Sequence, residues 1–117
     1  MIHFVFEGKR ELASRRAAAR AREIVESYLA TTVEKLQIDI SAVNEISSSY
    51  ADELFGVLAE QFSPDIFSSR VQLVGANAHV LHEILSAIAE RINRVVHDAK
   101  AAAEAAEQIL AQGSKAA

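Results

Sequence analysis

The chain has 117 residues, of which half are apolar and about a quarter charged, with a net charge of −4 and no cysteine. This length supports one domain with a hydrophobic core and is too short for two ordinary domains. The lack of cysteine excludes disulfides and thiolate metal sites, and no apolar run approaches the roughly 20 residues of a membrane span, so we expect a soluble cytoplasmic protein.

Charge is unevenly distributed along the chain. Residues 1–22 carry six Lys and Arg against two Glu, whereas residues 23–117 carry six against fourteen acids. The basic segment includes an arginine face on the first predicted helix, preceded by Lys9 and Arg10, which could attract the phosphates of nucleic acid. No aromatic residues are interleaved there to stack on bases. Nucleic-acid binding therefore stays an alternative, and we favour a solvated or partner-facing surface.

Strand and helix patterns alternate in the first part of the chain. The mostly apolar residues 2–6 end near Gly8 and predict a short first strand. Residues 11–29 have helical apolar spacing, with arginines on the opposite face. The short apolar stretch at residues 35–40, before Ser41, predicts a buried central strand.

The same alternation continues in the second part. A helix is expected over residues 47–62, starting at a run of serines. Residues 66–69 predict one short turn, and residues 70–75 predict a third strand that ends in glycine. Asn77 then caps a helix whose apolar residues recur every three or four positions up to Val95.

Alanine dominates the tail, residues 97–117, where helix propensity is high but only Ile109 and Leu110 are bulky. We expect an alanine-rich helical extension that is either frayed or docked on a neighbouring chain, as in a homodimer. Residues 1–96 form the domain. Its strands and helices predict an α/β fold with a small sheet of about four strands and helices mainly on one face.

The most informative segment is residues 38–55. A strand, a short turn and serines at a helix start bring backbone N–H groups and the positive end of the helix dipole to one point, where negative charge is stabilised. Such a start holds either a capping serine or a phosphoryl group near a serine. Ser49 with Asp52 three residues later resembles a capping box with Asp in place of Glu, so we expect a structural role for this pair.

Two stretches carry a resemblance to a known family: Ile38-Asp39-Ile40 at the strand end, and Ser48-Ser49-Tyr50-Ala51-Asp52-Glu53-Leu54-Phe55 at the helix start. They resemble the STAS domains of anti-sigma factor antagonists, in which a hydrophobic-Asp-hydrophobic strand end and a turn precede Asp-Ser-Ser-Gly. The sequence is more similar still to a bacterial STAS-like family of unknown function. The similarity covers roughly residues 10–95, with Leu12-Ala13-Ser14-Arg15 as a weaker second marker.

This resemblance implies regulation by partner switching. A histidine-kinase-like ATPase would bind the domain, phosphorylate a serine at the helix start and release it, or recognise the domain without phosphorylation. Ser48 aligns with the phosphorylated serine, while Ser47 and Tyr50 stand where the pattern has an acidic residue and a glycine. The resemblance also implies a partner-binding loop and helix start made of Asn44, Ser47, Ser49, Tyr50, Asp52 and Glu53. The alternative is a structural self-association module without phosphorylation, in which the alanine-rich tail joins copies of the chain and Ser48 is only part of the helix cap.

Other residues give little indication of catalysis or metal binding. His79 and His82 lie three apart on a predicted helix and could face one metal, but a zinc site needs further ligands, so we favour surface histidines. The sequence has no Gly-rich phosphate loop, no cysteine nucleophile and no Gly-x-Ser-x-Gly elbow. Asp39 would need a nearby histidine to form a Ser-His-Asp arrangement. We therefore expect neither an enzyme nor a cofactor.

Overall fold

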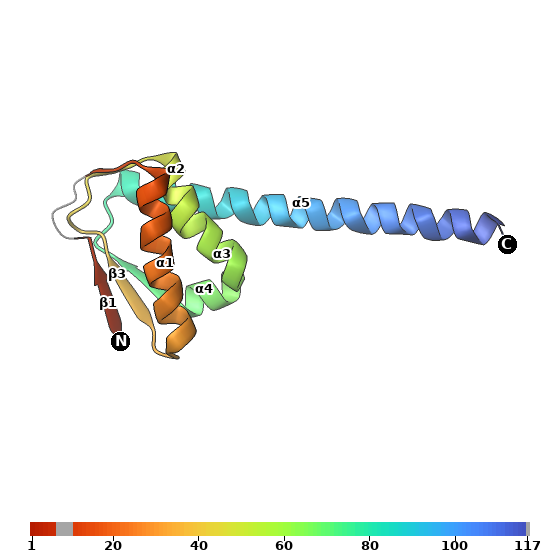
Figure 1. Cartoon of the computed structure of the whole chain (residues 1–117). Coiled ribbons are helices and arrows are strands. Elements are labelled where there is room, and N and C mark those ends of the chain that lie inside the picture. The colour runs from red at the N-terminus through yellow and green to blue at the C-terminus, as the bar shows by residue number, and fades with distance from the viewer. Residues whose placement is uncertain (7–10, 117) are drawn as a thin grey trace.

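The fold was obtained as a computed structural model that describes residues 1–6 and 11–116, with side chains through residue 108. Figure 1 shows a small globular part from which one long helix projects toward the C-terminus. The molecule is elongated for this reason, with extents of 66 × 29 × 23 Å.

Three parallel strands form the main sheet, in the order β1-β3-β5. They are β1 (Ile2–Val5), β3 (Leu36–Asp39) and β5 (Val71–Val74). The register aligns Phe4 with Ile38 and Leu73, a row of apolar side chains that packs toward the core. Because successive side chains alternate between faces, the neighbouring row of His3, Gln37 and Gln72 lies on the opposite face.

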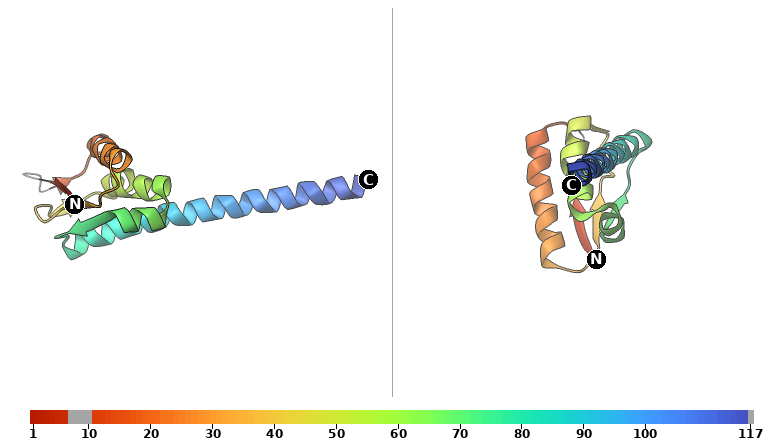
Figure 2. Two further views of the ribbon diagram at one scale, coloured as in Figure 1. Left: turned by 90° about the horizontal axis from the view of Figure 1, so that it is seen from below. Right: turned by 90° about the vertical axis from the view of Figure 1, so that its right-hand side faces the viewer.

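The helices lie on one face of this sheet. Viewed along the projecting helix, they stand in front of the strands (Figure 2, right). They are α1 (Arg15–Thr31), α4 (Pro64–Arg70), α5 (Ala78–Ala116) and a continuous helical segment made of α2 (Ser48–Ala51), the π-helix η1 (Asp52–Gly56) and α3 (Val57–Phe62). The predicted α/β class is confirmed, as are the small sheet, whose strands are parallel, and the helical C-terminal extension.

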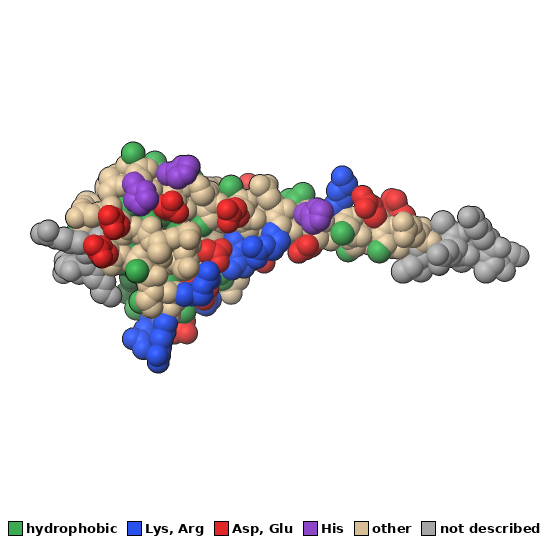
Figure 3. Space-filling model, turned by 90° about the horizontal axis from the view of Figure 1, so that it is seen from above, with side chains coloured by type: hydrophobic (Ala, Val, Ile, Leu, Met, Phe, Trp, Pro, Cys, Tyr) green, Lys and Arg blue, Asp and Glu red, His purple; other side chains and the backbone are tan. Residues whose placement is uncertain are grey.

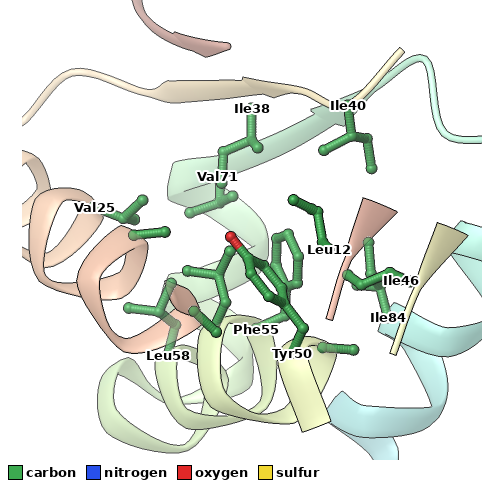
Figure 4. Packing of buried hydrophobic residues seen from close by; sticks show 14 of the residues in the cluster. Leu12, Val25, Ile38, Ile40, Ile46, Tyr50, Phe55, Leu58, Val71 and Ile84 are labelled. Carbon is green, nitrogen blue, oxygen red and sulfur yellow. The ribbon is translucent and has the colours of Figure 1, made fainter. Parts of the chain in front are cut away.

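The core lies between the sheet and the helices. Figure 4 shows Ile38 and Val71 of the sheet facing Val25 of α1, Phe55 of η1 and Leu58 of α3. Four of these five side chains are completely buried, and Val71 is nearly so. A fully buried aliphatic or aromatic side chain contributes about 1.5–3 kcal/mol, so this layer fixes the helices on the sheet.

The strand count differs from the expectation of about four. Five strands are present in two sheets, because β2 (Glu11–Leu12) and β4 (Glu45–Ile46) form a separate parallel pair. Residues 11–12 were expected to begin the first helix. That helix instead starts after Ser14, whose Oγ accepts a hydrogen bond from the backbone N of Ala17 at 3.2 Å, so the preceding residues stay extended.

The C-terminal helix α5 is one uninterrupted helix of 39 residues. The predicted tail at residues 97–117 therefore extends the preceding helix through residue 116. All side chains of residues 93–108 are exposed, whereas Val80 and Ile84 near its start are completely buried. No described helix combines the length and hydropathy that a membrane span requires.

Candidate functional site

The start of α2 is fixed by Ser47. Its Oγ accepts a hydrogen bond from the backbone N of Tyr50 at 3.0 Å and donates one to the carbonyl of Ala13 at 2.7 Å. Its backbone N donates to the carbonyl of Leu12 at 2.7 Å. Ser47 is therefore the N-cap, and the capping box expected at Ser49 and Asp52 is wrong, because the helix begins two residues earlier than that box requires.

Ser48 is the first residue of α2, and its side chain is exposed. Ser49, next along the helix, is half-buried. Within the described part of the chain, the Ser48 hydroxyl has no hydrogen-bond partner. The structure thus presents one unengaged hydroxyl at the positive end of a helix, where added negative charge is stabilised.

Tyr50 does not belong to the surface of this site. Only 2% of the residue is exposed, and its ring packs edge-on against Phe6 with 6.4 Å between ring centroids. Burial raises the pKa of its hydroxyl to about 12. Figure 4 shows the ring pointing into the layer between helices and sheet. The prediction that Tyr50 belongs to the partner-binding surface is therefore wrong. A large aromatic ring at this position is more stable in the core than in water.

Asp52 is held by two arginines from distant parts of the sequence. Arg91 of α5 donates from Nε to Oδ1 at 2.7 Å and from Nη2 to Oδ2 at 2.8 Å. Arg15 of α1 donates from Nη1 to Oδ2 at 3.0 Å. The hydrogen bonds from Arg91, together with the one from Arg15, lower the pKa of Asp52 to about 2 although its partial burial opposes this.

Glu53 extends the same set of ion pairs. It accepts hydrogen bonds from Arg15 Nη1 at 3.1 Å and from Arg22 Nη2 at 3.3 Å. Arg91 Nη1 also contacts Glu60 at 3.1 Å. We call these residues the charge cluster: Arg15, Arg22, Asp52, Glu53, Glu60 and Arg91. Basic and acidic side chains stand side by side where α5 leaves the globular part (Figure 3).

The π-helix η1 brings the charge cluster and α5 together. A Cβ added to Gly56 would lie 2.9 Å from Arg91 Cγ and 2.9 Å from Asp52 Oδ1. The absence of a side chain at Gly56 therefore lets α5 approach closely enough for the two-point contact between Arg91 and Asp52. The sequence showed that Asp52 follows the serines closely. Its partners Arg15 and Arg91 lie 37 and 39 residues away, so no local pattern indicated that they bind it.

Asn44 lies in the loop before β4 and is exposed. Its carbonyl accepts a hydrogen bond from Asn77 Nδ2 at 3.0 Å. Asn77 Oδ1 accepts one from the backbone N of Val80 at 2.8 Å, which confirms the predicted cap of the last helix. This loop is thereby connected to the first turn of α5.

Asp39 contacts Ser41 rather than the serine run. Its Oδ1 accepts hydrogen bonds from Ser41 Oγ at 2.6 Å and from Ser41 N at 2.9 Å. These two bonds lower the pKa of Asp39. Gly75, with a φ of 80°, packs so closely on Ser41 that an added Cβ would lie 2.6 Å from the serine Cβ. Asp39 therefore organises the turn after β3.

The arginine face of α1 is divided between two roles. Arg15 and Arg22 belong to the charge cluster, whereas Arg16 and Arg20 are exposed. Lys9 and Arg10, which were included in the possible phosphate-binding face, lie outside the described residues. With half of the face engaged by carboxylates, α1 offers less free positive charge than its sequence suggests.

His79 and His82 are both exposed on the first turns of α5. Within residues 1–6 and 11–108, no group of three or more His, Cys, Asp or Glu side chains is arranged to hold a metal ion. The prediction that His79 and His82 are surface histidines is confirmed.

Comparison with known proteins gives one match. A family model described as a STAS-like domain of unknown function matches residues 17–81, which is more than half of the chain. The matched segment includes the serine run and Asp52, whereas Arg15 and Arg91 lie outside it. No curated protein and no solved structure matches the chain.

Proposed function

Because the chain belongs to the family of STAS-like domains of unknown function, we propose that it is a regulatory protein-binding module that a partner recognises at the start of α2. The partner class is a histidine-kinase-like ATPase, which phosphorylates Ser48. In this step the Ser48 oxygen forms a bond to the γ-phosphorus of ATP, ADP leaves, and the hydroxyl proton passes to a base on the partner. The chain itself is not an enzyme.

The observation that carries this proposal is the different status of three adjacent serines. Ser47 uses its hydroxyl as a helix cap and as a donor to Ala13, and Ser49 is half-buried. Ser48 is exposed at the first position of the helix. A kinase could reach the Ser48 hydroxyl without first opening the fold.

The surroundings also suit a phosphoryl group. A phosphoserine adds a charge of about −1.5 to −2, and the first turn of a helix stabilises such charge through its N–H groups and dipole. The acids of the next turn, Asp52 and Glu53, are already paired with Arg15. These pairs limit the repulsion that the two carboxylates would otherwise exert on a phosphate at Ser48.

Phosphorylation is tested by purifying the protein from its native cells with phosphatase inhibitors and measuring its intact mass. No Lys or Arg lies between Lys35 and Arg70, so a second protease that cleaves at acidic residues is needed to release the short peptide 46–52. Fragmentation of this peptide in the mass spectrometer then assigns the phosphate to one of its three serines. We expect phosphate on Ser48 and none in a Ser48→Ala strain, with Ser49→Ala as the matched control. Phosphate on another residue, or none under any growth condition, would contradict this assignment.

Recognition is tested separately from phosphorylation. A photo-crosslinking amino acid at Ser48 should capture a partner in native cells, whereas the same group at Ser69, an exposed residue of α4, should not. Equal capture at both positions, or capture at neither, would rule out the start of α2 as the recognised surface.

A further inference from the structure

The projecting half of α5 exposes apolar surface. Val95 is 43% and Val96 62% exposed, and Leu85, nearer the domain, is 54% exposed. In Figure 1 this half of the helix extends away from every other element. In proteins most helical stability comes from the packing of an apolar face, so a helix with an exposed apolar face normally has a partner along it.

The residues of α5 repeat with the spacing of a coiled coil. Apolar residues are separated alternately by four and three positions over more than three heptads: Leu81, Leu85, Ile88, Ile92, Val95, Ala99, Ala102 and Ala106. We call this stripe the α5 seam. The opposite side carries polar residues, among them Glu90, Asn93, Arg94, His97, Lys100 and Glu104. A strict repeat of 3.5 residues is the pattern of helices that wind around each other.

Two apolar hollows lie along the domain half of the seam. One, of about 450 Å³, is lined by Leu85 and Ile88 together with residues of α4 and β5. The other, of about 150 Å³, is lined by Ile92, Val95 and Val96. Both are bordered by Ala59 and Pro64, so they form one groove between α5 and the α3–α4 connection.

We propose that α5 of a second copy of this chain fills this groove and pairs with the α5 seam in antiparallel orientation. The side chains of the seam are large near the domain, where they are leucine and isoleucine. Beyond Val95 the defined seam contains only alanine. An antiparallel pair with a symmetry centre between Ile92 and Val95 sets the large residues Leu81, Leu85 and Ile88 each against an alanine. The resulting layers place Ile92 opposite Val95, Ile88 opposite Ala99, Leu85 opposite Ala102, and Leu81 opposite Ala106 of the second copy.

The charged positions beside the seam also favour this orientation. In the antiparallel pair, Asp98 of the second copy lies on the same side of the seam as Arg91, which adds a carboxylate beside an arginine that also binds Asp52 and Glu60. A parallel pair would instead place Val96 of the second copy beside Arg91. It would also set alanine against alanine along the outer half and leave the domain groove without small side chains to enter it. Size and charge therefore select the second copy in antiparallel orientation over a parallel one.

Light scattering on the full chain over a range of concentrations tests the association. We expect a dimer that is weakened at least tenfold by Ala102→Glu, because this change buries a carboxylate opposite Leu85 of the second copy. Ala101→Glu is the matched control, since both alanines are exposed and Ala101 faces away from the seam. Circular dichroism shows whether both variants keep their helices. A chain that is monomeric throughout, or equal weakening by both variants, would overturn the proposal.

Cross-linking tests the orientation, and the lack of native cysteine makes it direct. A mixture of Leu85→Cys and Ala102→Cys chains should form a disulfide between the two variants on mild oxidation. Neither variant alone should do so, because identical positions lie about 25 Å apart along an antiparallel pair. Cross-linking of Ala102→Cys with itself would show a parallel pair and overturn the antiparallel assignment. Neither result depends on Ser48.

Discussion

Ser47 and Ser48 are neighbours with different tasks. Ser47 makes four hydrogen bonds, two of which reach back to the segment that precedes α1. Ser48 presents its hydroxyl to solvent. The first residue serves the stability of the helix start, and the second leaves a reactive group available on a rigid support.

Replacing these serines one at a time separates the two roles. Ser47→Ala should lower the free energy of unfolding by about 1–2 kcal/mol, because the cap of α2 and the bond to Ala13 are both lost. Ser48→Ala should change it by less than about 0.5 kcal/mol. Urea unfolding followed by circular dichroism measures both. A larger loss for Ser48→Ala than for Ser47→Ala would show that the assigned cap is incorrect.

For single residues, the sequence predicted that a helix starts at the serine run but not which role each serine has there. Adjacent serines all favour a helix start, so pattern alone did not show which one caps. Tyr50 was placed on the surface because the family resemblance puts its position in the partner-binding loop, whereas the turn of the helix directs its ring into the core. Asp52 was read as part of a local cap, since its arginine partners become neighbours only in the folded chain.

At the scale of elements, the charge cluster joins three helices that the sequence keeps apart. Arg15 comes from α1, Asp52 and Glu53 from η1, and Arg91 from α5. The side chains of Arg91 and Asp52 are each about one-fifth exposed, so water screens their interaction only in part. The cluster therefore fixes how α5 sits on the domain.

The lowered pKa of Asp52 predicts a dependence of stability on pH. Folding lowers this pKa from 3.8 to about 2, so the ionised carboxylate stabilises the fold above pH 3.8 and this contribution is lost as the pH falls toward 2. Between about pH 5 and about pH 2 the wild type should lose about 1–2 kcal/mol more than Asp52→Asn. Denaturant unfolding at several pH values measures this difference. Glu23→Gln, which changes an exposed acid of α1, is the control and should leave the profile unchanged.

The elements themselves were largely predictable. Periodicity gave the strands at residues 2–6, 35–40 and 70–75 and the helices that follow them. It failed where elements were short: β2 and β4 have two residues each, too few for any pattern. The π-helix was not predicted either, because no local residue preference indicates its wider turn. Gly56, which packs closely against Arg91 of α5, is its last residue.

At the scale of the molecule, the described side chains of the tail contribute exposed surface and no packing within the chain. The radius of gyration of 18.1 Å exceeds the roughly 13 Å of a compact chain of this length. The sequence left open whether the tail is frayed or docked, because alanine is equally suited to a solvated helix and to a close helix pair.

Deleting residues 97–117 should therefore shorten the molecule without unfolding it. We expect the free energy of unfolding to change by less than about 0.5 kcal/mol relative to full-length Ala102→Glu, the variant designed to be monomeric. Small-angle X-ray scattering should show a radius of gyration that falls toward about 13 Å. A large loss of stability on deletion would mean that the tail packs on its own domain.

The attachment of α5 has a mechanical consequence. Among the side chains of α5 described through residue 108, Arg91 is the last that forms ion pairs with the domain, and residues 93–116 project beyond it for about 36 Å. A tilt of the projecting part of α5 by about 10° at Arg91 would displace its far end by roughly 6 Å. A change at the start of α2 that weakened the contact between Asp52 and Arg91 would allow such a tilt. A small local change would then move the far end of α5 by about the length of one helix turn.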